Sequence, residues 1–194
     1  MVKRDSAPRL PAAERRLQIL EAVLPVFARR GLEGAGTRDL AAAARVSEPL
    51  LYRHFGDKLG LYVEVYRDAE RRVAEVYRSA VDSPGTRQAR LLAVLDAAVT
   101  LHGQDESVPL FLASVPLDIR RHPELRTAVT KVPIETPAIL ARLVATPDGR
   151  STTQLVTLIS SVTTGMALMV GEGGHAAYAK TLRACGEHLL LDPP

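Results

Sequence analysis

The sequence is short of the residues that several classes of protein need. It contains one cysteine, no tryptophan and only 4% aromatic residues. A single cysteine excludes an intramolecular disulfide and a zinc site built from several cysteines. The low aromatic content disfavours strand-rich sandwiches and barrels, and it disfavours stacking platforms for single-stranded nucleic acid.

Long apolar segments are also missing. The chain has no run of about 18 apolar residues, the length that a membrane-spanning helix needs. Its first residues lack the apolar core of a signal peptide. We therefore predict a cytoplasmic protein that makes no contact with a membrane.

The remaining composition is that of a globular protein. The chain has 194 residues, 46% of them hydrophobic and 24% charged, which suits one long domain or two short ones. The net charge is +3, and the basic excess lies in residues 1–58, which hold 11 Lys or Arg against 7 Asp or Glu. Such an excess is typical of a solvated surface as well as of a nucleic-acid-binding face, so charge alone leaves both open.

Apolar residues recur at helical spacing along almost the whole chain, which predicts an all-α fold. Proline disrupts the interior of a helix, so Pro133 and Pro137 should kink or split the segment 123–144. The expected helices cover residues 12–30, 38–44, 47–55, 58–81, 87–102, 108–121, 123–144, 152–170 and 176–191.

Local signals set the ends of the first three helices. Gly31 is expected to stop the first helix, and Pro25 is expected to kink it. Thr37 and Ser47 are good N-cap residues for the second and third helices, because a hydroxyl can accept a hydrogen bond from a free backbone N–H.

The most informative segment is residues 37–58, with the sequence TRDLAAAARVSEPLLYRHFGDK. Two helices of about eight residues are joined by three residues, which are the dimensions of a helix-turn-helix. The second helix would turn outward a face that suits a polyanion, since arginine carries charge and tyrosine and histidine donate hydrogen bonds to phosphates. Geometry alone leaves open that these are merely two packed helices.

Five pieces of residues 15–62 stand in the order and spacing of a known family. They are Phe27-Ala28-Arg29-Arg30-Gly31, Thr37-Arg38-Asp39-Leu40-Ala41, Val46-Ser47, Leu51-Tyr52-Arg53-His54-Phe55, and Asp57-Lys58 before Leu61. This segment, about a quarter of the chain, resembles the DNA-binding domain of the TetR (tetracycline repressor-like) transcriptional regulators. One departure is Arg45, which stands in the turn where the family usually has glycine; a left-handed conformation there costs about 1 kcal/mol.

Residues 1–11 are rich in basic residues and proline, which predicts a disordered basic arm. The resemblance implies the organisation of the rest, beginning with an N-terminal three-helix helix-turn-helix DNA-binding domain at 12–57. A helical ligand-binding and dimerisation domain follows at 58–194.

The resemblance also implies that the helix 47–55 enters the major groove of double-stranded DNA. A cation at a helix start is disfavoured by the helix dipole, which favours a phosphate contact for Lys58. Glu48 either stabilises the first turn or accepts a hydrogen bond from cytosine. The DNA-contacting candidates are Thr37, Arg38, Ser47, Glu48, Pro49, Leu50, Tyr52, Arg53, His54 and Lys58.

The C-terminal part is expected to hold a small-molecule effector. Few charges fall inside its helices, so we expect an apolar effector, although the same residues could simply form core. Asp118, Arg120 and Arg121 are expected on the surface. The ligand-binding candidates are Tyr62, Tyr66, Phe111, Leu112, Val115, Met166 and Met169.

The same part is expected to form a homodimer, by resemblance through the helices 152–170 and 176–191. On the last helix Tyr178, Leu182, Cys185 and Leu189 align, and Leu182 is the expected interface residue. The histidines lack metal-pair spacing, so we predict no metal site and no cofactor.

These features together predict a ligand-responsive transcriptional regulator rather than an enzyme. We expect a repressor that binds a palindromic operator as a homodimer and is released by a small apolar effector. The alternatives are an all-helical enzyme or small-molecule carrier without DNA binding, and a family member that has lost DNA binding. No nucleophile–base pair, paired carboxylates or phosphate-cradling loop supports catalysis.

Overall fold

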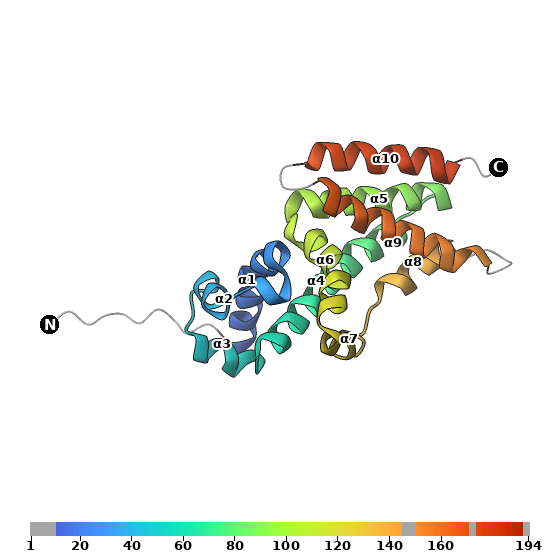
Figure 1. Ribbon diagram of the computed structural model, residues 1–194. Coiled ribbons are helices and arrows are strands. Elements are labelled where there is room, and N and C mark those ends of the chain that lie inside the picture. Colours follow the sequence, from blue (N-terminus) through green and yellow to red (C-terminus); the bar gives the residue numbers. More distant parts are fainter. Residues whose placement is uncertain (1–10, 145–149, 171–173, 192–194) are drawn as a thin grey trace.

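The computed structural model describes residues 11–144, 150–170 and 174–191, and these residues form ten helices (Figure 1). The all-α prediction is confirmed. The predicted arm at 1–11 lies, apart from Pro11, outside the described residues. The helices are α1 Ala12–Gly34, α2 Thr37–Ala43, α3 Glu48–Phe55, α4 Lys58–Val81, α5 Arg87–Gln104, α6 Ser107–Arg121, α7 Pro123–Val129, α8 Thr136–Val144, α9 Arg150–Val170 and α10 His175–Leu191.

The long helix α4 connects the two ends of the molecule. Helices α1, α2 and α3 gather at one end, and α5, α8, α9 and α10 pack together at the other (Figure 1). Helix α4 packs against α1 at one end and against α5 and α8 at the other, while α6 packs against both α1 and α9. Two helices, α4 and α6, therefore contact both ends.

An aromatic cluster marks the place where α1, α4 and α6 meet. The Phe27 and Tyr62 rings pack edge to face with centroids 5.1 Å apart, and the Tyr62 and Phe111 centroids lie 5.0 Å apart. All three side chains are fully buried. Burial of an aromatic side chain contributes about 1.5–3 kcal/mol, so this cluster holds α1 firmly against the rest of the protein.

The segment 123–144 is split into two helices. Helix α7 ends at Val129, and α8 begins only at Thr136, beyond Pro133. Pro137 stands in the first turn of α8, where a missing backbone N–H breaks no hydrogen bond. The prediction that prolines interrupt this segment is confirmed.

Two details of the first helices differ from expectation. Helix α1 changes direction at Gly31 and then continues to Gly34; Gly31, rather than Pro25, has the non-helical backbone. The φ of 65° and ψ of −174° at Gly31 are accessible essentially to glycine alone. Thr37 is the first residue of α2 and not its N-cap, since Gly36 precedes the helix without a side-chain bond.

Candidate nucleic-acid interface and ligand cavity

Helix α3 is held against α2 by an apolar seam. Leu40, Leu51 and Phe55 are buried, and Val46 in the turn packs against the same core. Arg45 adopts the left-handed conformation that the turn requires, with φ 52°, and its side chain is exposed. Arginine thus replaces glycine without loss of the helix-turn-helix.

The start of α3 is capped as its sequence predicts. The Ser47 Oγ accepts a hydrogen bond from the Leu50 N–H at 3.4 Å, and Pro49 stands in the first turn, where its missing N–H costs nothing. This cap fixes the direction in which α3 leaves the turn. The predicted DNA-contacting residues that α3 leaves exposed or partly buried are Glu48, Pro49, Leu50, Tyr52, Arg53 and His54.

Two pairs of the predicted residues meet across α2 and α3. The hydroxyls of Thr37 and Tyr52 form a hydrogen bond of 2.8 Å. Arg38 Nε lies 3.7 Å from Glu48 Oε1, and Arg38 is almost fully exposed. The Thr37–Tyr52 pair joins the start of α2 to α3.

Lys58 lies apart from these pairs. Its Nζ is 3.4 Å from the Glu33 carbonyl oxygen and 3.3 Å from that of Ala35, at the end of α1. The ammonium therefore donates hydrogen bonds to carbonyl oxygens at the C-terminal end of α1, where the helix dipole favours a cation. This contact fixes the position of Lys58 beside the helix-turn-helix.

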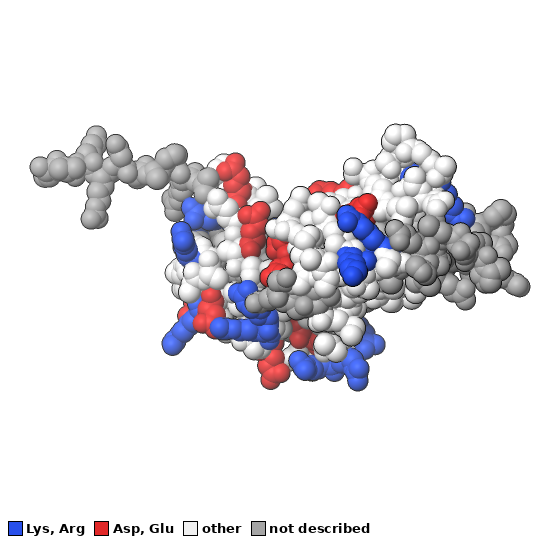
Figure 2. All heavy atoms as spheres, turned by 90° about the horizontal axis from the view of Figure 1, so that it is seen from above, with Lys and Arg blue, Asp and Glu red and all other residues white. Residues whose placement is uncertain are grey.

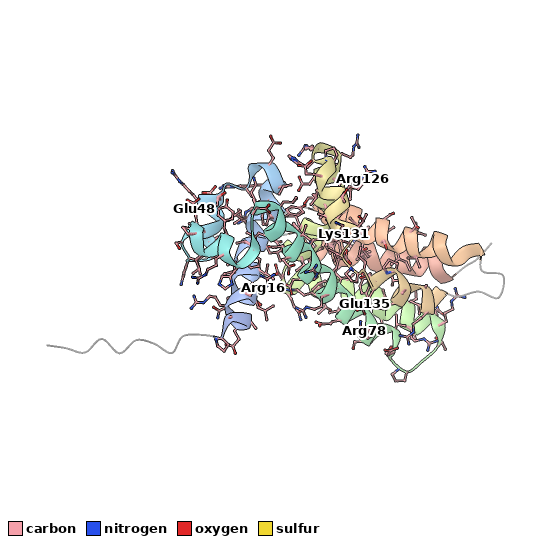
Figure 3. All side chains as sticks on the ribbon, turned by 90° about the horizontal axis from the view of Figure 1, so that it is seen from below. Arg16, Glu48, Arg78, Arg126, Lys131 and Glu135 are labelled. Atoms are coloured by element: carbon pink, nitrogen blue, oxygen red, sulfur yellow. The ribbon has the colours of Figure 1, made fainter. Side chains whose placement is uncertain are left out.

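Sequence reasoning missed Arg16 of α1, which contacts the C-terminal end of α3. Its guanidinium donates to the His54 carbonyl oxygen, lies 4.4 Å from the centroid of the Phe55 ring and pairs with Glu64 at 2.9 Å. Figure 3 shows Arg16 on α1 and Glu48 on α3 at the same end of the molecule. An arginine on the polar side of an amphipathic helix carries no sequence signal for such a role.

Acidic and basic side chains are interspersed over this end of the molecule. Figure 2 shows both, at the left of the view, over the end that carries α1 to α3. Arg30 pairs with Asp39, as Arg38 does with Glu48. These pairs place acidic groups beside basic ones on the folded surface, and they leave the net basic excess of residues 1–58 unchanged because both partners lie within that segment.

A cavity of about 360 Å³ lies among α4, α5, α6, α8, α9 and α10. Its size is typical of a small-molecule site. The lining residues are Tyr66, Glu70, Val73, Tyr77, Ala98, Leu101, Pro109, Leu112, Val115, Pro116, Ile119, Ile134, Thr136, Pro137, Ser160, Thr163, Thr164 and Tyr178.

Three of the predicted ligand-binding residues line this cavity, namely Tyr66, Leu112 and Val115. The other four, Tyr62, Phe111, Met166 and Met169, are not among its lining residues. Tyr62 and Phe111 belong to the aromatic cluster with Phe27, and Met169 is 88% exposed. Helical periodicity identifies residues that face inward, but it does not distinguish those that line a space from those that fill one.

Sequence reasoning also missed polar residues of the cavity, above all Glu70. The Thr136 hydroxyl donates to Glu70 Oε2 at 3.2 Å across 66 positions of sequence. Burial raises the pKa of Glu70, opposed by hydrogen bonds from Thr136 and Tyr66. The sequence does contain a signal for Glu70, because it is a charged residue among the inward-facing positions of the helix 58–81.

Beside the aromatic cluster, Asp118 joins three helices. It is 3% exposed, and its Oδ2 accepts hydrogen bonds from the Leu32 N–H at 3.0 Å and from the Tyr62 hydroxyl at 2.8 Å. The surface position expected for Asp118 is wrong, because these two donors lie inside the protein. Burial and the nearby carboxylate raise the pKa of Tyr62.

Two further observations concern the described residues only. They contain no group of three or more His, Cys, Asp or Glu side chains arranged to hold a metal ion. None of their helices is both long enough and apolar enough to cross a membrane.

Helices α2 and α3 form a helix-turn-helix, because a buried apolar seam joins them and α3 is capped at its start. Residues 19–65 match the family described as "Bacterial regulatory proteins, tetR family". Over 89 residues the chain is 39% identical to the HTH-type transcriptional activator FasR of Mycolicibacterium smegmatis; the match covers 46% of this chain and 41% of FasR. Other curated relatives are named as repressors. The chain thus spans less than half the length of these relatives.

The fold of nearly the whole chain recurs in solved structures. A TetR-like transcriptional regulator from Rhodococcus sp. RHA1 superposes with a TM-score of 0.72 at 21% identity, covering 95% of this chain and all of that one. FadR from Bacillus subtilis, solved in complex with stearoyl-CoA, gives a TM-score of 0.67 at 18% identity, with coverage of 88% and 96%.

Residues 19–65 therefore form a DNA-binding domain of the tetR family, and the described part of the chain has the fold of a TetR-like regulator. The match of residues 19–65 to regulatory proteins supports the regulator prediction over the enzyme alternative.

Proposed function

We propose that the chain regulates transcription by binding an inverted repeat in double-stranded DNA as a homodimer. This proposal rests on one observation: the protein holds α3 by one side and exposes the other side. Leu51, Phe55 and Arg16 hold one side of α3, while Arg53 is exposed on the other and Tyr52 is partly exposed with its hydroxyl bonded to Thr37. A rigid helix with a free polar face is what major-groove recognition requires.

Selection of bound sequences from a random pool of double-stranded DNA tests this proposal directly. The purified chain should enrich a palindrome whose half-sites lie about one helical turn apart. Enrichment of no sequence, or of a single half-site, would contradict it. The selected palindrome then serves in the measurements below.

We predict that Lys58→Ala reduces the salt dependence of DNA binding. If Lys58 contacts a phosphate, its loss should lower the slope of log K against log salt by about 1 per half-site. Lys131→Ala is the matched control, because Lys131 is an exposed lysine that follows α7 and lies outside the helix-turn-helix. Fluorescence anisotropy at several salt concentrations measures both slopes, and an unchanged slope for Lys58→Ala would exclude the phosphate contact.

We propose that the exposed faces of α9 and α10 form the dimer interface. Leu158, Leu168 and Met169 are exposed apolar residues of α9, and Ala177 and Thr181 are exposed on α10. Apolar residues beside small ones suit close packing of two helix pairs. An isologous two-fold contact would place the two copies of α3 symmetrically.

Leu182 does not belong to this face. It is 0% exposed within a single chain, so it packs against the chain's own core. A charge at Leu182 would destabilise the fold instead of separating protomers. Cys185 and Leu189, which align with it in sequence, have side chains outside those that the structure describes.

We propose that an apolar effector binds in the cavity and changes the position of α3 through α4 and α6. Helix α6 contributes Leu112, Val115, Pro116 and Ile119 to the cavity and carries Asp118, whose carboxylate binds the Leu32 N–H. Helix α4 contributes Tyr66, Glu70, Val73 and Tyr77, and only two residues separate its start from the end of α3. Displacement of either helix would therefore be transmitted to the helix-turn-helix.

We propose a repressor, as the resemblance to tetracycline repressor-like proteins implies. FasR is named an activator, so the sign of regulation needs its own test. A reporter gene placed behind the selected palindrome should be expressed less when the chain is present. Increased expression would establish activation.

A further inference from the structure

The charged side chain that lines the cavity is acidic. Among its lining residues, all of them in the described part of the chain, Glu70 is the single charged side chain. An apolar ligand would leave this carboxyl group facing it with no compensating charge. Burial of an unpaired carboxylate is costly, so Glu70 calls for a physical explanation.

Neighbouring arginines do not neutralise Glu70. Arg71 pairs with Asp68 at 2.6 Å and with Glu75 at 2.7 Å. Arg78 pairs with Glu135, and Figure 3 shows these two side chains together beside the connection that precedes α8. Among the described residues no ion pair involves Glu70, whose recorded hydrogen bonds come from the neutral hydroxyls of Thr136 and Tyr66.

Three tyrosines share the cavity with Glu70, namely Tyr66, Tyr77 and Tyr178. Burial raises the pKa of all three, that of Tyr77 to about 12. They therefore stay neutral at physiological pH, and aromatic rings attract a desolvated cation; one face of Tyr178 already stacks on the His102 ring, with centroids 4.4 Å apart. An anionic group would find no positive partner among the lining residues.

We propose that this site takes an apolar molecule with one positive charge, such as a hydrophobic amine, whose cationic group pairs with Glu70. The inference rests on the proposed function, since it names the chemical class of the effector for the same cavity. The apolar body of the ligand fills the space lined by Leu112, Val115 and Ile119. The charged group reaches α4, the helix that leads to α3.

Three probes of one shape test the inference: phenylbutylamine, phenylbutanol and phenylbutyrate carry a positive, neutral and negative end group. Isothermal titration measures the Kd of each with the full chain. The amine should bind about tenfold or more tightly than the alcohol, because hydrogen bonds to charged groups are the stronger ones. Phenylbutyrate should bind most weakly.

Two variants assign the preference to the carboxylate. Glu70→Gln should bring the amine and the alcohol to within about twofold of each other, since it removes the charge and keeps the shape. Thr136→Val is the matched control, because it removes a donor to Glu70 and leaves the charge; the amine preference should persist. Circular dichroism verifies that both variants fold.

The outcomes distinguish the proposed preference for a cationic ligand from the proposed effector site. Binding of the alcohol with no preference for the amine, or a preference that persists in Glu70→Gln, would overturn the inference and leave the cavity as an effector site. Tighter binding of phenylbutyrate would also overturn it. Failure of all three probes to bind would contradict the proposed effector site itself.

Discussion

Replacing Asp118 with alanine should lower the free energy of unfolding by about 2–4 kcal/mol, because two buried donors lose their acceptor. These donors are the Leu32 N–H and the Tyr62 hydroxyl, which lie on different helices. For a chain of this size the loss corresponds to a fall in Tm of roughly 5–15 °C. Thermal and chemical denaturation followed by circular dichroism measure it.

Hydrogen exchange can also locate where Asp118→Ala loses stability in the protein. Hydrogen exchange should accelerate at the Leu32 amide in Asp118→Ala, since that amide loses its partner. Asp118→Asn keeps one acceptor oxygen and should lose less stability than Asp118→Ala. Asp96→Ala is the control, because Asp96 forms an exposed ion pair with Arg183, and such pairs contribute little.

Equal stability of Asp118→Ala and the wild type would contradict the role assigned to this carboxylate. The space around Gly31 supports the same contact between Asp118 and α1. A Cβ at Gly31 would lie 2.7 Å from Asp118 Oδ1, so the close approach of α1 and α6 depends on glycine at this position.

Replacing Leu168 with arginine should convert the homodimer to a monomer. Leu168 is 45% exposed in one chain, so the substitution should leave the protomer folded. In the proposed interface it would bury a charge with no partner, a cost of several kcal/mol that weakens the dimer Kd by roughly a thousandfold. Light scattering coupled to size-exclusion chromatography measures the mass.

DNA binding should fall with the dimer, because a monomer contacts a single half-site. Leu117→Arg provides the matched control: Leu117 is 46% exposed on α6, outside the proposed interface residues of α9 and α10. This control should remain dimeric and bind the palindrome as the wild type does. A dimeric Leu168→Arg protein would place the interface elsewhere.

The helix-turn-helix could be predicted because its determinants are local. Leu40, Leu51 and Phe55 have the spacing that buries them together, and the Ser47 hydroxyl caps α3 from three residues away. Interactions over so short a stretch of chain depend on helical geometry alone. Thr37 was misassigned because its hydroxyl bonds to Tyr52 on the next helix, a partner that no local pattern specifies.

The sequence by itself determined the all-α class, the ends of most helices and the outward face of α3. Only the tertiary structure decided that Asp118 is buried against Leu32, 86 positions away, that Thr136 bonds to Glu70, and that Leu182 faces its own chain. Periodicity reports which side of a helix is buried. The partner it meets depends on how side chains from distant helices fill the space between them, and that is a property of the packed molecule.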